Sequence, residues 1–232
     1  MRNTLIVFSG KAQSGKTTCS QLFRDYVHYR DLAEKSVDTD KYPYLNTPGA
    51  MRVQIHSFAT ALKDIAKKYF NWDGDKGIYY QTFTKDTGAL TLTAGGVTYT
   101  PDTVQMPVAD RGRTLLLNIG KKFREIRPSI WLDYVINNIK SIDKDTHNTI
   151  PDTFFVIDDM RFKNELIEAK TFHTCYSVRV SRTEGALDLD DISERDLDNA
   201  EFDFYIDNNG SREDLTNKLA ELYNKIEARN GN

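Results

Sequence analysis

The sequence predicts an α/β fold in three layers, with a central parallel sheet, helices on both of its faces, an inserted lobe and a lid. Two observations support this fold class. Short apolar runs alternate with amphipathic helical patterns along most of the chain, as in proteins whose parallel strands are joined by helices. A glycine-rich turn also joins the first apolar run to the first helical pattern, an order that is typical of such sheets.

The first part of the chain shows two successive pairs of a strand and a helix. Residues 4–9 are apolar and end in Ser-Gly, which predicts a buried strand, and a helix is expected from about residue 15 to residue 33. Residues 51–57 alternate in polarity and predict a second strand. The helix that follows should bury one apolar face, formed by Phe58, Leu62, Ile65, Ala66 and Tyr69.

Residues 71–110 interrupt this alternation. The region is rich in glycine, threonine, aspartate and aromatic residues. Within it, Gly95 and Gly96 separate two arms of alternating polarity, which predicts a β-hairpin. We therefore expect an insertion at 71–110 in a core that is formed by residues 1–70 and 111–232.

The alternation returns after the insertion. Two helical patterns come first, and the apolar runs 153–158 and 175–181 then predict two strands with a short helix between them. Residues 204–207 predict a last strand, and Ser211 is placed to cap a final amphipathic helix.

Composition and charge limit the classes of protein to consider. The chain has 232 residues, of which 39% are hydrophobic and 28% charged, with a net charge of -3, so it is expected to be globular and not to bind nucleic acid through bulk charge. No apolar run approaches the ~18 residues of a membrane span, and the first run is too short for a signal peptide. Cys19 and Cys175, the two cysteines, predict small core residues in a reducing compartment, which favours a cytoplasmic location.

A phosphate-binding motif of the form G-x-x-x-x-G-K-[ST] occupies residues 10–17. Glycine allows backbone torsions that are closed to other residues and lets the backbone amides approach phosphate oxygens, while the following helix adds the positive end of its dipole. In this motif the lysine reaches the outer phosphates and the hydroxyl of Thr17 ligates magnesium, so we expect ATP and Mg²⁺ as ligands. The predicted ATP contacts are Gly10, Ala12, Gln13, Ser14, Gly15, Lys16, Thr17 and Thr18.

Two aspartates end the apolar run at 153–158. An aspartate at this place can hold magnesium through water or orient the attacking group, and we expect Asp159 to serve the metal site together with Thr17. Asp158 precedes it directly. The alternative is that the pair only begins a turn, where aspartate is common.

The class of nucleotide-binding protein follows from what accompanies the motif. The N-K-x-D element with which GTPases recognise their base is not found. A small-molecule kinase must instead neutralise a second phosphorylated compound and keep water from accepting the phosphoryl group. Guanidinium groups bind phosphate oxygens well, although solvated surface arginines would produce the same pattern. The candidates are Arg111, Arg113, Arg124, Arg127 and Arg161.

Residues 182–203 are strongly acidic, with nine acidic and two basic residues and little apolar periodicity. We expect this segment to be the lid, with Arg182 or Arg195 reaching the transferred phosphoryl group. A solvated, charged loop is the alternative interpretation.

Several segments together resemble the bacteriophage-type deoxynucleoside monophosphate kinases, which are P-loop nucleotide kinases. The resemblance covers most of the chain apart from residues 35–50 and the insertion. Its matching pieces are the glycine-rich motif, S-F-A-T-A-L-K at 57–63, R-T-L-L-L-N-I-G-K-K-F-R at 113–124, Trp131, V-I-D-D-M-R-F-K-N-E at 156–165, I-S-E at 192–194 and D-N-N-G-S at 207–211.

The resemblance implies the P-loop NTPase fold and transfer of the γ-phosphoryl group of ATP to a deoxynucleoside monophosphate, with the insertion as part of the acceptor-binding lobe. The catalytic candidates are then Lys16, Asp159, Arg161 and Arg182. The acceptor would contact Phe58, Lys63, Arg113, Arg124, Trp131 and Arg161. Residues 208–211 would lie near the donor adenine, with Asn209 and Ser211 as the expected contacts.

Two other functions stay open at this point. The chain would also suit a kinase of another small phosphorylated metabolite, such as a coenzyme precursor, or a nucleotide-dependent switch or assembly protein. The sequence does not rank the acceptor bases, and it leaves a homodimer possible. The expected partner is a small molecule, and neither a nucleic acid nor a membrane is expected.

Overall fold

The structure is a computed structural model that describes residues 3–35, 51–70, 72, 92–94, 97–99, 111–146, 152–183 and 192–231. The chain forms two compact units, one from Met1–Phe58 and Leu132–Asn232 and the other from Ala59–Trp131. The predicted insertion lies mostly outside the described residues, so its boundaries stay a prediction.

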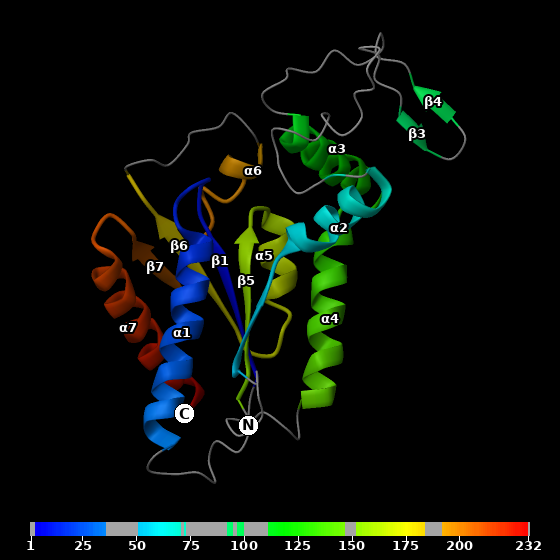
Figure 1. The fold of residues 1–232 in the computed structure, drawn as a ribbon. Coiled ribbons are helices and arrows are strands. Elements are labelled where there is room, and N and C mark those ends of the chain that lie inside the picture. The colour runs from blue at the N-terminus through cyan, green and yellow to red at the C-terminus, as the bar shows by residue number, and fades with distance from the viewer. Residues whose placement is uncertain are drawn as a thin grey trace. The chain divides into compact units, whose positions relative to one another are not determined.

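The first unit is built on a five-stranded parallel sheet with the order β2-β5-β1-β6-β7, which confirms the predicted α/β class (Figure 1). Its strands are β1 (Thr4–Ser9), β2 (Val53–His56), β5 (Phe154–Met160), β6 (Cys175–Ser181) and β7 (Phe204–Asp207). The helices that belong to this unit are α1 (Lys16–Lys35), α4 (Ile130–Thr146, from Leu132 on), α5 (Lys163–Ala169), α6 (Ile192–Arg195) and α7 (Arg212–Asn230).

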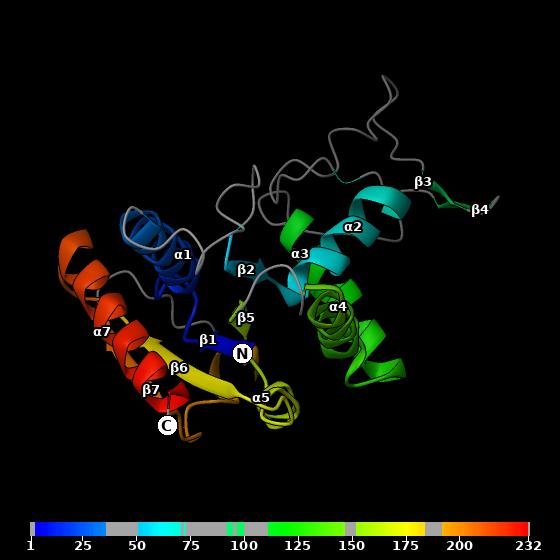
Figure 2. The same cartoon turned by 90° about the horizontal axis from the view of Figure 1, so that it is seen from below.

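Helices cover both faces of this sheet. Figure 2 shows α1 and α7 side by side on one face and α5 on the other. The face under α1 and α7 is the main core, where the ring of Phe154 meets Phe23 edge-on at 5.6 Å and Tyr223 at 5.8 Å. Burial of such a side chain stabilises the fold by roughly 1.5–3 kcal/mol.

All five strands of this sheet run in the same direction, so their carboxyl ends meet at one edge. That edge, at the top of Figure 1, receives the glycine-rich turn after β1, Ser57 after β2, the aspartates at the end of β5 and Asn208 after β7. Open parallel sheets place their ligand sites at this edge, so the parallel topology gathers candidate groups from four loops.

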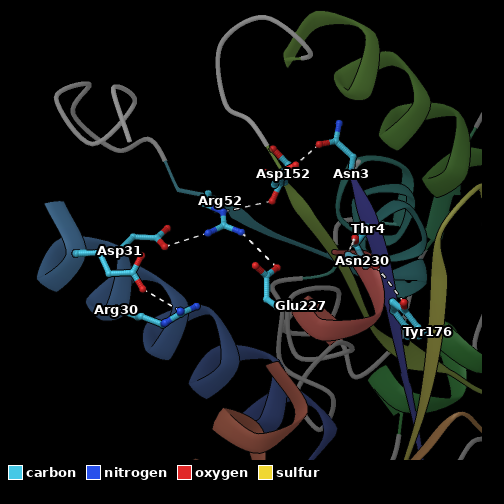
Figure 3. Close-up of polar contacts among 11 residues, drawn as sticks. Asn3, Thr4, Arg30, Asp31, Arg52, Asp152, Tyr176, Glu227 and Asn230 are labelled. Atoms are coloured by element: carbon cyan, nitrogen blue, oxygen red, sulfur yellow. Dashed lines mark hydrogen bonds and ion pairs between the residues drawn. The ribbon is translucent and has the colours of Figure 1, made fainter. Parts of the chain in front are cut away.

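The opposite edge of the sheet is held by a buried arginine (Figure 3). The side chain of Arg52 is 5% exposed and donates hydrogen bonds to the Asp31 carboxylate at 3.1 Å and to the backbone oxygen of Asp152 at 3.3 Å. A second ion pair joins it to Glu227 at 3.8 Å. Arg52 therefore ties α1, the loop before β5 and α7 together.

The second unit contains α2 (Phe58–Phe70, from Ala59 on), α3 (Arg111–Ile126) and a hairpin of β3 (Leu92–Ala94) and β4 (Val97–Tyr99). The two short strands pair antiparallel, which confirms the predicted arms of the hairpin, while its glycine turn lies outside the described residues. Within this unit a Cβ atom at Gly120 would lie 3.0 Å from the side chain of Leu62, so glycine lets α2 and α3 approach closely.

Candidate functional site

The glycine-rich turn adopts a backbone that its glycines make possible. Gly15 has a φ of 98° and Gln13 a φ of 62°, a region that L-residues rarely adopt. A Cβ atom at Gly10 would lie 2.3 Å from the backbone oxygen of Val180 and 2.5 Å from the hydroxyl of Ser14. Gly10 is therefore required by the close approach of β6, and Gly15 by its torsion.

Lys16 folds back onto this turn. Its side chain is largely buried, and its Nζ donates hydrogen bonds to the backbone oxygens of Gly10 at 2.6 Å and Lys11 at 2.7 Å. An ammonium group held over a turn in this way supplies positive charge at the carboxyl edge of the sheet. The first turn of α1 holds no acidic residue, so nothing within that turn opposes the positive end of the helix dipole.

Among the described residues, the buried hydroxyl of Ser14 has no hydrogen-bond partner. A buried polar group without a partner costs about 1–3 kcal/mol. Thr17 and Thr18, by contrast, present exposed side chains in the first turn of α1. The turn thus combines a buried cation, an unsatisfied hydroxyl and two accessible hydroxyls within a few residues.

Cys19 also lies in the first turn of α1, but it is a core residue. The side chain is fully buried, and burial raises the pKa of its thiol to about 12, with Lys16 opposing the shift. Burial likewise raises the pKa of Cys175 to about 12, and both cysteines are free. Cys19 is thus the core residue that the sequence predicts, whereas Cys175 is only half-buried.

Asn208 ties the last loop to the glycine-rich turn. Its side-chain Nδ2 donates to the backbone oxygen of Ser14 at 2.9 Å, and its backbone amide donates to Ser181 at 2.8 Å. A Cβ atom at Gly15 would lie 2.3 Å from the same Nδ2. The sequence singled out this loop but not this contact, because nothing local indicates that an amide will bond to a turn so far away in the chain.

The two residues expected at the donor adenine have contacts of their own. Asn209 accepts a hydrogen bond from the backbone amide of Thr183 at 2.7 Å, and its amide donates to Asp207. Ser211 caps α7, as predicted, by accepting from the backbone amide of Asp214 at 3.1 Å. Both residues are exposed, and whether they contact adenine stays a prediction.

The aspartate pair lies where β5 changes register against β1, between Val7 and Ser9. Irregularities of this kind re-aim side chains and are common near functional sites. Asp158 is buried, whereas Asp159 is half-buried. Both oxygens of Asp159 accept hydrogen bonds at the start of α2, Oδ1 from the Phe58 backbone amide at 2.8 Å and Oδ2 from the Ser57 hydroxyl at 2.6 Å.

The segment after the aspartates begins α5. The carboxylate of Glu165 is buried and accepts from the backbone amides of Arg161 at 2.8 Å and Phe162 at 3.0 Å. In the Asp-x-Arg-Phe-x-x-Glu segment, the glutamate therefore closes the first turn of a helix. Arg161, the predicted phosphate ligand, is partly buried and lies directly after β5 at the carboxyl edge.

Three of the carboxylates in the predicted lid are bonded to the core. Asp196 accepts from the backbone amide of Lys163 at 2.7 Å, Asp198 pairs with Arg179 at 2.7 Å, and Asp203 accepts from the backbone amide of Ser177 at 2.7 Å. Some of the acidic side chains in residues 182–203 thus serve to attach the segment to neighbouring strands and helices. Whether any part of the segment covers a ligand stays a prediction.

Arg179 links that segment to the end of β1, directly before the glycine-rich turn. One of its guanidinium nitrogens bonds to the hydroxyl of Ser9 at 3.1 Å while another pairs with Asp198. The sequence did not single out Arg179, which lies within β6. The two arginines it did select, Arg182 and Arg195, are exposed.

The remaining predicted acceptor residues, apart from Phe58, belong to the second unit. Trp131 is 4% exposed, stacks on Phe123 with ring centroids 5.4 Å apart, and donates from its indole nitrogen to Gly120 at 3.3 Å. These contacts explain Trp131 as a core residue of that unit. Lys63 is exposed on α2 and Arg124 is half-buried on α3, while the side chain of Arg113 lies outside what the structure describes.

Phe58 is the first residue of α2 and is 6% exposed. Its side chain packs in the interior, and its backbone amide is the group that bonds to Asp159. Of the predicted site residues, the first unit brings the glycine-rich turn, Asp159, Arg161 and residues 208–211 to one edge of its sheet.

Comparison with known proteins does not place this chain in a family. A scan against protein-family models matches none, and a search of curated proteins finds no significant match. In the described part of the chain, no helix has the length and apolar character needed to cross a membrane.

Proposed function

We propose that this chain is a P-loop kinase that transfers the γ-phosphoryl group of ATP to a deoxynucleoside monophosphate. The observation that carries the proposal is the glycine-rich turn, in which Gly10 has no room for a side chain and the Lys16 amine lies over the turn's carbonyl oxygens. This arrangement at the carboxyl edge of a parallel sheet suits a triphosphate, because backbone amides, a lysine and a helix N-terminus act together there.

In the proposed reaction, Lys16 exchanges its contacts with the turn for contacts with the β- and γ-phosphates of ATP. The hydrogen bond from Asn208 to Ser14 keeps the turn in place during this exchange. The amine stays close to the transferring group and stabilises the charge that develops on its oxygens. No covalent intermediate with the protein is involved, so positioning and electrostatics supply the rate enhancement.

The oxygen ligands near the turn fit a magnesium ion that arrives with ATP. The described residues contain no group of three or more His, Cys, Asp or Glu side chains that could hold a metal. Magnesium commonly takes only one or two protein oxygens and completes its shell with phosphate and water. Thr17 would supply one such oxygen, and Asp158 lies near the end of β5 at the same edge. When bound, the ion neutralises charge on the β- and γ-phosphates.

The acceptor class rests on the resemblance together with the arginines. Arg161 follows β5 at the carboxyl edge of the first unit, and Arg113 and Arg124 lie on α3 of the second. Guanidinium groups match the oxygens of a monophosphate in two-pronged geometry, which favours an acceptor that already carries a phosphate.

A coupled assay of ADP release tests this function. Wild-type protein is mixed with ATP, Mg²⁺ and each common or modified deoxynucleoside monophosphate, and ATP without acceptor is the blank. We expect ADP release that depends on at least one of these acceptors. Release only with another phosphorylated metabolite would replace the substrate class, and release stimulated only by a macromolecule would favour a switch protein.

Substitution of the lysine supplies the matched control for this assay. We expect Lys16→Ala to reduce turnover by roughly 100- to 1,000-fold or more, because a charge aimed at the transition state is lost. Circular dichroism should show an unchanged fold. Normal activity in this variant would contradict the proposed mechanism.

A further inference from the structure

Both oxygens of the Asp159 carboxylate bond to the start of α2. Its Oδ1 accepts from the Phe58 backbone amide at 2.8 Å and its Oδ2 from the Ser57 hydroxyl at 2.6 Å. The contacts join positions more than a hundred residues apart, so the end of β5 holds the beginning of a helix that follows β2.

The geometry points to Asp159 as a positioning residue: it acts on the acceptor side of the reaction through the first turn of α2, without itself binding metal or phosphate. The expected effect on the acceptor rests on the proposed function, whereas the effect on α2 does not. The sequence-based expectation that Asp159 serves the magnesium site is the alternative that the experiment below tests.

The first backbone amides of α2 require hydrogen-bond partners from outside the helix, and Asp159 supplies one. The first backbone amides of a helix have no partner within the helix, and α2 carries no acidic residue in its first turn. A carboxylate at that end bonds an amide and also interacts favourably with the positive end of the helix dipole. Asp159 supplies both from a strand, where the backbone holds it rigidly.

Loss of the Asp159 contacts should also affect Lys63, a predicted acceptor residue on the same helix. Lys63 lies on the exposed side of α2, in the turn after the one that Asp159 holds. If the first turn frays, the helix that carries Lys63 is less well ordered at its start. The loss should therefore appear in the KM for the acceptor, while the KM for ATP, which depends on the glycine-rich turn, changes little.

Asparagine and alanine at position 159 separate this role from metal ligation. Asparagine keeps a carbonyl oxygen for the Phe58 amide, and its amide group can donate to the Ser57 hydroxyl, so the hold on α2 survives without charge. Alanine removes both contacts. A role that needs the carboxylate charge, such as metal ligation or catalysis, would instead be strongly impaired in both variants.

The experiment compares Asp159→Asn, Asp159→Ala and Ser57→Ala with wild type. Asp64→Asn is the matched control, because Asp64 is exposed on the same helix and its substitution changes the charge equally. Hydrogen exchange is followed at the backbone amides that begin α2, and steady-state kinetics are measured with ATP and acceptor varied separately.

We expect exchange at the start of α2 to be roughly 5- to 30-fold faster in Asp159→Ala, the factor typical of a lost helix cap. The acceptor KM should rise by a similar factor. Asp159→Asn should stay close to wild type in both measurements, Ser57→Ala should fall between, and Asp64→Asn should match wild type.

Two results would overturn the inference. One is unchanged exchange at α2 in both Asp159→Ala and Ser57→Ala. The other is an Asp159→Asn variant that loses turnover as fully as Asp159→Ala at saturating acceptor, which is the behaviour of a catalytic or metal-binding carboxylate. If wild type phosphorylates no deoxynucleoside monophosphate, the proposed function fails, and hydrogen exchange still decides whether Asp159 holds α2.

Discussion

The side-chain amide of Asn208 bonds to the backbone oxygen of Ser14 across 194 positions of sequence, at a distance of 2.9 Å. This hydrogen bond joins the loop after the edge strand β7 to the glycine-rich turn after the central strand β1. It also accounts for Gly15, because a Cβ atom there would collide with the amide. The shape of the turn is thus held from outside as well as by its own torsions.

Asn208→Ala should weaken ATP binding. Loss of one neutral hydrogen bond costs about 0.5–1.5 kcal/mol, so we expect the Kd for ATP, measured by titration calorimetry, to rise about 3- to 10-fold. Asn230→Ala is the control, because Asn230 bonds to Thr4 and Tyr176 at the other edge of the sheet and should lower stability without changing the Kd (Figure 3). Equal affinities in wild type and Asn208→Ala would refute this role.

Gly10→Ala should destabilise the protein by roughly 2 kcal/mol or more, because the new methyl group meets the backbone oxygen of Val180, which cannot move aside. Gly231→Ala serves as the control. A Cβ atom at Gly231 would lie 3.4 Å from its nearest neighbour, so this change should stay within about 0.5 kcal/mol. Urea denaturation gives both free energies of unfolding, and equal values would disprove the steric argument.

Arg52→Met should lower the free energy of unfolding by about 3–5 kcal/mol, because it leaves the buried carboxylate of Asp31 without its ion-pair partner. Adding Asp31→Asn should recover part of the loss. Lys225→Met, which removes an exposed pair with Glu221, should cost no more than about 1 kcal/mol. Chemical denaturation measures all three, and a loss as small in Arg52→Met as in Lys225→Met would show that the buried pair contributes little.

Asp203 should make the free energy of unfolding depend on pH in the acidic range. Partial burial raises the pKa of this carboxyl, but hydrogen bonds from Lys170 and Ser177 outweigh that effect and hold the pKa below its ordinary 3.8. A lowered pKa stabilises the fold at neutral pH, and this contribution is lost as pH falls through the folded-state pKa. The stability difference between wild type and Asp203→Asn should therefore shrink as the pH falls from about 7 to about 3.

The measurement for Asp203 is urea denaturation across that pH range. Lys170→Met should weaken the same dependence, because it removes the first of the two hydrogen-bond partners that lower the pKa. A difference that stays constant with pH would mean that Asp203 acts through packing alone.

The elements of the first unit were predictable because each depends on local chemistry. Apolar runs with turn residues at their ends indicated all five strands of the sheet, and the spacing of apolar residues indicated the main helices. Gly10, Gly15 and Lys16 were predictable for the same reason, since the torsions and charge that a phosphate turn needs are properties of a few consecutive residues.

Pairings between distant segments were not predictable in this way. The strand order β2-β5-β1-β6-β7 decides that Asp159 meets Ser57 and that Asn208 meets Ser14, and no local pattern encodes that order. For the same reason the sequence did not indicate that the indole of Trp131 donates to a backbone oxygen within its own unit, and contact of Trp131 with the acceptor stays a prediction.

The sequence by itself thus determined which residues form strands and helices and which turn requires glycine, because backbone torsion and apolar periodicity are local. Only the tertiary structure decided how the polar side chains are used. A carboxylate bonds to whichever donor the folded chain brings to it. For Asp159, Glu165 and Asp203 those donors are backbone amides that lie as close in sequence as three positions or as far as a hundred and one.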